Sequence, residues 1–358
     1  MIRVGFIGCG RIAGLHVPGY ADHEDHEDAR LYAVCDADAD RASACARAWG
    51  AEKVYTDYRC LLDDPAVGAV EVLTPQTVHE PMVIDALAAG KHVAVQKPMT
   101  TSLDSAQRML DAAARTDRVF KVTDNYLFHP ALVKMKQLLG EGAIGEPMTL
   151  RMKFVGGCWA GGWKVPESTW GWRVGEVAAG RGIQTFDHGH HMWATAWWLM
   201  GAFERVAAWV DGMDDVPDCP AVIDCPAVVM WKHEGQKRYG TCEYNQAPEL
   251  AIPSDYYSCD ESFEVTGRAG ILQVRRCTGR ITPGPVLRLC TSAGWQDIDA
   301  PGDWAEGFKG ATHNFIDAML GRAEPLLTGE QALHILRFGL ALRRASDEHR
   351  EVALSEMV

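Results

Sequence analysis

The sequence predicts an α/β domain with a doubly wound parallel sheet, followed by an α+β domain with a mostly antiparallel sheet. Two observations support this prediction. Over residues 1–122, short β-branched or apolar runs alternate with longer Ala-rich segments, which is typical of parallel strands joined by helices. Beyond about residue 123, strand-like runs follow one another without intervening helices, as in an antiparallel sheet. With 358 residues, the chain is also long enough for two domains.

The elements of the first domain follow from this alternation. Gly50 and Gly90 come directly after two helical stretches, where the C-terminal end of a helix favours glycine. The predicted strands are 3–7, 31–35, 69–73, 92–95 and 119–122, and the predicted helices are 37–49, 79–89 and 103–115.

The second domain should span 123–358, and its last helix should pack back on the first domain. A helix, a Gly- and Trp-rich stretch, a series of strands and two late helices follow in order. The predicted helices are 131–139, 307–320 and 328–347, and the predicted strands are 148–154, 205–211, 228–232, 238–244, 261–266, 271–275 and 286–290.

Charge and composition restrict the partners. The net charge is -13 and there is no block of Lys or Arg, so the chain lacks the basic footprint of a protein that binds nucleic acid or an anionic membrane surface. No apolar run approaches the roughly 18 residues of a membrane helix, and no charged-then-apolar leader precedes the first strand. We therefore expect a small-molecule partner.

The eleven cysteines indicate the compartment. Their number is odd and no Cys-x-x-Cys pair occurs, which fits neither a disulfide framework nor a zinc ribbon. We expect a reduced, cytoplasmic protein. The run 22–28, which alternates His with Asp and Glu, has suitable metal ligands, but its charge repulsion favours a solvated loop.

A glycine motif directly follows the first strand. It reads Gly8-Cys9-Gly10-Arg11-Ile12-Ala13. The first glycine permits a tight turn, the second lets the backbone approach a pyrophosphate, and the small alanine allows close helix packing. Backbone N–H groups at the start of the next helix, around Arg11 and Ile12, would face the phosphates.

Asp36 ends the second predicted strand at about the spacing that this motif requires. A carboxylate there accepts hydrogen bonds from ribose hydroxyls and repels a 2′-phosphate, so NAD is favoured over NADP. The alternative is a Gly-rich turn with an Asp that caps a helix. The context favours dinucleotide binding.

Polar residues follow two further strands, at the edge of the sheet where ligands bind in such folds. Thr74-Pro75 follows the strand at 69–73, and Gln96-Lys97-Pro98 follows the strand at 92–95. Beside a cationic nicotinamide ring, the charged form of Lys97 would be disfavoured, so this lysine could exchange a proton near neutral pH. Alone, Lys97 also fits a surface lysine.

A second constellation reads Asp187-His188-Gly189-His190-His191. If this stretch is helical, Asp187 and His191 are four residues apart and share a face. A carboxylate beside an imidazole can orient it as a general acid or base. A metal site and a purely structural cluster are the alternatives, but adjacent helical residues converge poorly on one ion, and we predict no metal.

These motifs together resemble the glucose-fructose oxidoreductase/inositol dehydrogenase family, also called Gfo/Idh/MocA, over nearly the whole chain. The resemblance rests on several segments. They are Gly8 to Ala13, Asp36, Thr74-Pro75 with His79, Gly90 to Val93 leading to Gln96-Lys97-Pro98, Asn125-Tyr126, His129-Pro130, Trp172-Arg173 and Asp187-x-Gly189-x-His191.

The resemblance implies a Rossmann domain, an open-faced sheet domain, and dimers or tetramers assembled through the sheets. It implies that Lys97, Asp187 and His191 form a catalytic set at the domain interface, with His191 as the base on a sugar or polyol hydroxyl. Lys97 would hydrogen-bond the same oxygen, and Asp187 would orient one of the two. It further implies cofactor contacts at Thr74, Pro75, His79 and Gln96, and substrate contacts at Asn125, Tyr126, Trp172, Arg173 and His190.

Two positions depart from the family pattern. Gln96 stands where Glu is usual, which removes a carboxylate that stabilises the Lys97 ammonium, although Gln still accepts a hydrogen bond from a ribose. Arg181 stands in a stretch that is commonly Gly-Gly-Gly, and it fits either a pocket for an acidic or hydroxyl-rich substrate or the surface.

Tryptophans are concentrated between residues 159 and 209. Indole faces stack on the C–H faces of pyranose rings, so Trp159 and Trp163 are candidate substrate contacts, with core packing as the alternative. We prefer core packing for Trp193, Trp197 and Trp198.

The sequence thus predicts an NAD-dependent dehydrogenase for a secondary hydroxyl of a sugar, sugar derivative or cyclic polyol. One alternative is glycoside cleavage through transient C3 oxidation and elimination, with Tyr126, His190 or His313 as the further base. The other is a non-catalytic NAD sensor, which the Lys97, Asp187 and His191 set disfavours.

Overall fold

The computed structural model describes residues 1–21, 28–235 and 237–357, so the His/Asp/Glu run falls, except for Asp28, outside the described residues. The chain forms two compact units. Unit 1 consists of Met1–Phe128 and Ala305–Leu336, and unit 2 of His129–Trp304 and Arg337–Val358. The segment Ala305–Leu336 thus belongs to unit 1, although it follows most of unit 2 along the chain.

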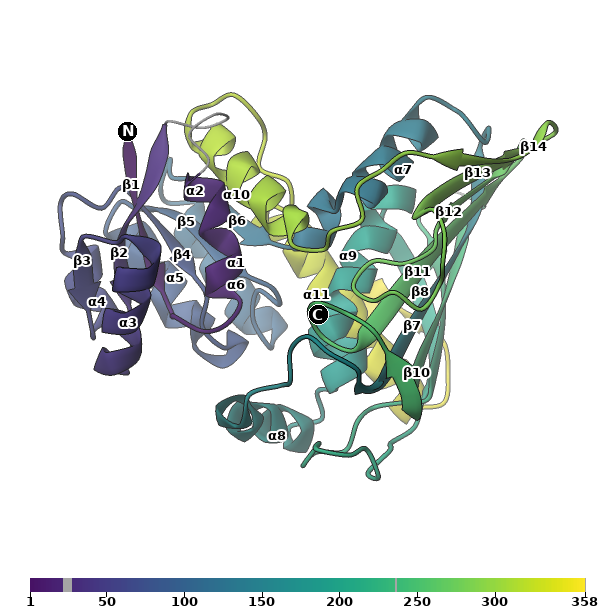
Figure 1. Ribbon diagram of the computed structural model, residues 1–358, viewed down its shortest axis with the longest axis horizontal. Coiled ribbons are helices and arrows are strands. Elements are labelled where there is room, and N and C mark those ends of the chain that lie inside the picture. Colours follow the sequence, from purple (N-terminus) through teal and green to yellow (C-terminus); the bar gives the residue numbers. More distant parts are fainter. Residues whose placement is uncertain (22–27, 236, 358) are drawn as a thin grey trace. The chain divides into compact units, whose positions relative to one another are not determined.

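Unit 1 contains a six-stranded parallel sheet (Figure 1), which confirms the predicted α/β class. The strand order is β3-β2-β1-β4-β5-β6, so the chain winds outward from β1 in both directions. Every strand predicted for this unit is present, and the short β3 was missed because its three residues are mostly exposed and carry no apolar pattern. The strands are β1 Ile2–Ile7, β2 Ala29–Cys35, β3 Lys53–Tyr55, β4 Ala69–Val72, β5 His92–Gln96 and β6 Phe120–Thr123.

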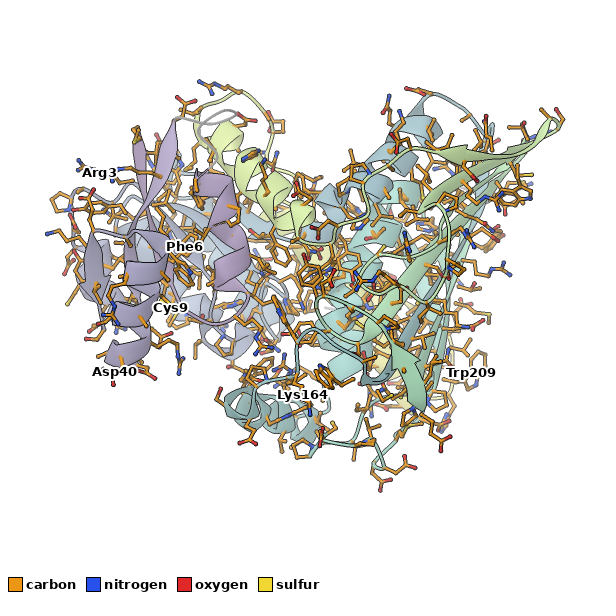
Figure 2. All side chains as sticks on the ribbon, viewed as in Figure 1. Arg3, Phe6, Cys9, Asp40, Lys164 and Trp209 are labelled. Atoms are coloured by element: carbon orange, nitrogen blue, oxygen red, sulfur yellow. The ribbon has the colours of Figure 1, made fainter. Side chains whose placement is uncertain are left out.

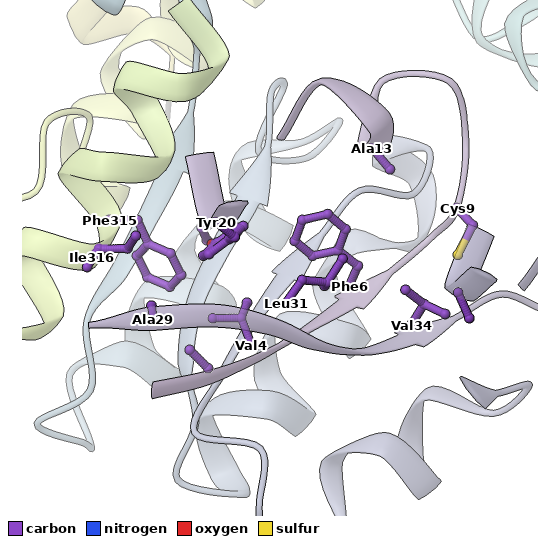
Figure 3. Packing of buried hydrophobic residues seen from close by; sticks show 13 residues of the cluster. Val4, Phe6, Cys9, Ala13, Tyr20, Ala29, Leu31, Val34, Phe315 and Ile316 are labelled. Atoms are coloured by element: carbon purple, nitrogen blue, oxygen red, sulfur yellow. The ribbon is translucent and has the colours of Figure 1, made fainter. Parts of the chain in front are cut away.

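Helices of unit 1 cover the sheet, and α10 from the late segment packs with the N-terminal helices. Phe315 and Ile316 of α10 join Val4 and Phe6 of β1 in one buried cluster (Figure 3). The helices are α1 Ala13–His16, α2 Pro18–Ala21, α3 Ala39–Trp49, α4 Tyr58–Leu62, α5 His79–Ala88, α6 Leu103–Ala113 and α10 Glu306–Met319, with 3-10 turns η1 Gln76–Val78 and η2 Asn125–Phe128.

A lysine lies buried in the middle of β6. The Lys121 ammonium donates to Oδ1 of Asn314 at 2.7 Å and to the carbonyl of Ala311 at 3.3 Å. Burial lowers the pKa of Lys121 to about 7, against a partial opposing effect of Glu71. The folded protein therefore holds this proton less tightly than the unfolded chain does.

This difference predicts a pH-dependent stability. Between pH 7 and 10.5 the unfolded chain keeps the Lys121 proton and the folded chain does not, so the free energy of unfolding should rise with pH. From pH 7 to 9 the gain should be about 2 kcal/mol, and Lys121→Met should abolish it. Urea unfolding at both pH values measures the difference. Equal pH slopes in the variant and the parent would contradict the assignment.

Unit 2 contains a nine-stranded, mostly antiparallel sheet, which confirms the predicted α+β class. Its order is β14-β13-β12-β11-β7-β10-β9-β8-β15, and β7 pairs with β10 in parallel. The strands are β7 Pro147–Trp159, β8 Phe203–Val210, β9 Ala227–His233, β10 Tyr239–Ile252, β11 Cys259–Gly267, β12 Ile271–Val274, β13 Leu287–Thr291, β14 Gly294–Ile298 and β15 Val352–Ala353.

Helices α7 and α9 lie along one face of this sheet (Figure 1). Trp193 of α9 packs edge-on against Trp231 and tilted against Tyr244, which confirms core packing for this tryptophan. The helices are α7 Pro130–Gly140, α8 Trp170–Ala178, α9 Gly189–Met200 and α11 Gly329–Asp347, which crosses the boundary of the units, with the short helices η3 Glu167–Thr169, η4 Ile183–His188 and η5 Leu354–Glu356.

The other face of the sheet is partly apolar. Trp209 on β8 pairs with Val228 on β9, and these side chains are 59% and 43% exposed. Met230, two residues further along β9, is also exposed. Figure 2 shows side chains projecting from this face, with Trp209 labelled. Within the described part of the chain, no helix combines the length and the apolar character that crossing a membrane requires.

Candidate functional site

The glycine turn after β1 has the backbone geometry that its sequence predicts. Gly8 has φ 102°, and a Cβ there would lie 2.9 Å from the carbonyl carbon and oxygen of Leu73. Only glycine fits such a position. At Gly10 a Cβ would meet no atom within 4 Å, so the backbone is open to a ligand on that side. The helix after the turn begins at Ala13, and Arg11 and Ile12 precede it.

Asp36 lies directly beside this turn. Its Oδ2 accepts a hydrogen bond from the Cys9 N–H at 2.9 Å, and its Oδ1 accepts one from the Asp38 N–H at 3.0 Å. The Arg41 guanidinium lies 3.4 Å from the same carboxylate. A tethered carboxylate next to an open glycine backbone fits the ribose and phosphates of a dinucleotide.

His79 connects the loops that follow β4 and β5. Its Nε2 lies 2.8 Å from the carbonyl oxygen of Thr74, and its Nδ1 lies 3.1 Å from that of Met99. The ring is fully buried, and burial lowers its pKa. These contacts show how His79 holds the Thr74-Pro75 turn in place.

Lys97 follows β5 at the carboxyl edge of the sheet. Its N–H donates to Oε1 of Gln96 at 2.8 Å and also reaches the carbonyl of Thr123 at 3.2 Å. The Gln96 amide is therefore a direct neighbour of the Lys97 backbone. Asn125 and Tyr126 follow β6 in η2 and are almost fully buried.

In unit 2, the predicted acid/base pair lies on a continuous helical stretch. Asp187 belongs to the π-helix η4, and His191 lies in the first turn of α9. The Asp187 N–H donates to the carbonyl of Gly182 at 3.1 Å, the five-residue spacing of a π-helix. Such widened turns occur frequently at functional sites. His190 and His191 are buried, whereas Asp187 is half-buried.

Two acidic residues that sequence reasoning missed hold this stretch. Asp224 is buried and accepts hydrogen bonds from the N–H groups of Gln184 and Thr185, each at 2.7 Å. Burial raises the pKa of Asp224. Glu261 on β11 lies 3.0 Å from Nε2 of His188, whose ring centroid is 5.6 Å from that of His191.

The predicted tryptophan contacts have different surroundings. Trp159 is 55% exposed at the end of β7, with the Lys164 ammonium 5.2 Å from its ring centroid. Trp163 instead packs edge-on against Tyr256 at 5.4 Å. On α8, the Arg173 guanidinium lies 4.3 Å from the ring centroid of Trp172.

Arg181 lines a pocket of about 190 Å³ together with Gly182, Asp224 and Arg343. Its guanidinium makes two hydrogen bonds to Glu176, at 2.8 and 3.0 Å. Among residues 1–21, 28–235 and 237–357, no three His, Cys, Asp or Glu side chains gather as a metal site would require.

The fold and the glycine turn define a dinucleotide-binding protein. Residues 2–124 match the oxidoreductase family with an NAD-binding Rossmann fold, and residues 136–354 match the C-terminal alpha/beta domain of that family. The chain therefore belongs to the Gfo/Idh/MocA family, as its motifs indicate, and unit 1 carries the NAD-binding fold.

Several relatives carry enzyme names. The chain is 32% identical to levoglucosan dehydrogenase of Pseudarthrobacter phenanthrenivorans over 49% of its own length, a match that spans only 44% of that relative. It is 26% identical to D-apiose dehydrogenase of Paraburkholderia graminis, over 98% of this chain and 89% of that relative. The solved complex of a levoglucosan dehydrogenase with NADH and levoglucosan has the same fold, with a TM-score of 0.82, 22% identity and 99% of each chain covered.

Proposed function

We propose that this protein is an NAD-dependent dehydrogenase that oxidises a secondary hydroxyl of a sugar, sugar derivative or cyclic polyol, or reduces the ketone in reverse. One observation carries the proposal: an Asp187/His191 pair on one helical stretch of a chain whose other unit is an NAD-binding Rossmann fold. The sugar-dehydrogenase names of relatives support it.

Each catalytic residue has a role in the proposal. His191 takes the hydroxyl proton as general base, and Asp187 orients the His191 ring. Lys97 hydrogen-bonds the same oxygen and stabilises its developing negative charge. When bound, the nicotinamide supplies the hydride acceptor.

The proposed binding residues fall into a group for NAD and a group for the substrate. We propose that the glycine turn, Asp36, the Thr74-Pro75 turn with His79, and Gln96 hold NAD, which the open backbone at Gly10 supports. Substrate contacts are assigned to residues of both units. They are Asn125, Tyr126, Trp159, Trp163, Trp172, Arg173 and His190.

A panel of monosaccharides, inositols, sugar acids and glycosides tests the proposal. With NAD, at least one member should generate NADH, measured by absorbance at 340 nm. Glycoside cleavage, with Tyr126, His190 or His313 as the further base, would instead release the aglycone without net NADH. No NADH from any member, with NADH still bound tightly, would favour an NAD sensor.

We further propose that the protein forms a homodimer or homotetramer through the face of the unit 2 sheet that carries Trp209. The exposed Trp209, Val228 and Met230 support this, because adjacent apolar side chains on a surface mark contact sites. A monomer in sedimentation velocity at micromolar concentration would contradict it.

A cytoplasmic location is proposed from the cysteines, all eleven of which are free thiols. Cell fractionation tests this location. Recovery of the protein from an oxidising compartment would contradict it.

A further inference from the structure

A chain of polar side chains crosses the core of unit 1 and ends at Lys97. Tyr20 donates its hydroxyl proton to Oε1 of Glu71 at 2.5 Å, and Oε2 of Glu71 lies 2.5 Å from Nδ1 of His16. Nε2 of His16 lies 3.3 Å from Nε2 of Gln96, whose Oε1 accepts the Lys97 N–H. His16, Glu71 and Tyr20 are at most 2% exposed.

The direction of every proton in this chain follows from one fixed donor. A backbone N–H can only donate, so the Gln96 atom that faces Lys97 must be the carbonyl oxygen. The Gln96 NH₂ group then faces His16, whose Nε2 must accept. His16 therefore carries its proton on Nδ1, where it faces Glu71, and the close approach of Nδ1 to the carboxylate requires a proton between the two atoms.

Aromatic rings around His16 and Tyr20 shield these hydrogen bonds from water. The His16 ring has Phe308 at 5.2 Å and Phe6 at 6.3 Å between ring centroids, both edge-on. Tyr20 packs edge-on against Phe6 at 5.6 Å between ring centroids and belongs to the buried apolar cluster (Figure 3). Because His16, Glu71 and Tyr20 are almost fully buried, their polar atoms depend on one another for hydrogen bonds.

A buried lysine lies on the same face of the sheet as the Glu71 carboxylate. Glu71, Ala94 and Lys121 occupy paired positions on β4, β5 and β6, so Glu71 and Lys121 project from the same face of the sheet. The Lys121 ammonium and the Tyr20 hydroxyl are the other titratable groups beside Glu71.

We propose that Tyr20, Glu71 and His16 are positioning residues that set the orientation of the Gln96 amide and, through it, the Lys97 backbone. The proposal rests on the proposed function, because Gln96 and Lys97 act there on cofactor and substrate. If His16 carried its proton on Nε2, the amide would have to turn, and its NH₂ group would face the Lys97 N–H. Two donors repel, so Lys97 and the adjoining cofactor edge would shift.

Glu71→Gln tests the chain because it changes one oxygen to NH₂ with little change in volume. The Gln NH₂ would donate to His16 Nδ1 while its oxygen still accepts from Tyr20, which moves the His16 proton to Nε2. ¹⁵N-histidine NMR should show this tautomer change, with the His16 signal assigned by its loss in His16→Gln. The Kd for NADH should rise by about tenfold, as one mispaired hydrogen bond implies.

The double variant Glu71→Gln/Gln96→Glu should reverse the direction of the hydrogen bonds on both sides of His16 without removing either of them. His16 would donate from Nε2 to the new carboxylate at 96, and that carboxylate would still accept the Lys97 N–H. We expect the Nε2 tautomer together with recovery of most of the lost NADH affinity.

Asp85→Asn is the matched control in the same unit. Asp85 also accepts a hydrogen bond from a tyrosine hydroxyl, that of Tyr58, at 2.7 Å. It does not belong to the hydrogen-bonded series of Tyr20, Glu71, His16 and Gln96. It should leave the His16 tautomer and the NADH affinity unchanged. An unchanged tautomer in Glu71→Gln, or a changed one with parental NADH affinity, would overturn the proposal. Both readouts need no substrate, so a failure of the proposed dehydrogenase activity would be seen separately.

Discussion

Replacing His191 with alanine should lower turnover by about 10²- to 10⁴-fold, the usual contribution of a general base. His191 belongs to unit 2, whereas the glycine turn and Asp36 that we propose for NAD belong to unit 1, so the variant should still bind NADH. Lys97→Ala should lose turnover to a similar extent, because the developing oxyanion loses its hydrogen-bond donor. Steady-state kinetics and NADH fluorescence titration measure the two effects.

A matched lysine control separates this effect from a general loss of charge. Lys134 on α7 donates to Gln137 on the exposed side of that helix, and Lys134→Ala should keep parental turnover. Near-normal turnover in both His191→Ala and Lys97→Ala would contradict the assignment of these two residues to catalysis.

Gly8→Ala should abolish measurable NADH binding and lower the stability of unit 1. The new Cβ would lie 2.9 Å from the backbone of Leu73, and the φ of 102° is unfavourable for any residue with a side chain. The turn and β4 must then separate, which also disturbs the Cys9 N–H that holds Asp36. Calorimetry and NADH titration report stability and binding.

Gly10→Ala isolates the effect on the ligand. Its Cβ meets no protein atom within 4 Å, so the melting temperature should stay at the parental value while NADH affinity falls. The loss arises because the methyl group occupies the side on which the backbone approaches the pyrophosphate. Parental NADH affinity in Gly10→Ala would show that the dinucleotide does not approach there.

The sequence predicted the parts of the fold that have strong local patterns. The buried parallel strands are continuous apolar runs and most strands of unit 2 alternate, so these were found. β14 and β15 were missed, because β14 is almost wholly exposed and β15 has only two residues. The short strand β3 has no such run. The return of Ala305–Leu336 to unit 1 depends on α10 packing against α1 and α2, which no local pattern encodes.

The candidate site was predictable to the extent that spacing along the chain encodes it. Gly8 and Asp36 follow consecutive strands of a parallel pair, so their proximity follows from the topology. Glu261 had a signal that was not used: it shares the inward face of β11 with Phe263 and Val265, where an acid requires a partner. The His16–Glu71 contact joins α1 to β4, and no spacing rule reports it.

The transfer of a labelled hydride tests the dehydrogenase proposal most directly. A substrate that generates NADH in the sugar panel is prepared with deuterium on the carbon that carries the hydroxyl to be oxidised. We predict one equivalent of NADH with the deuterium on its nicotinamide ring, together with one equivalent of the ketone, measured by mass spectrometry and NMR. Release of an aglycone without net NADH, with solvent exchange of the C2 hydrogen, would contradict the dehydrogenase and support transient oxidation followed by elimination.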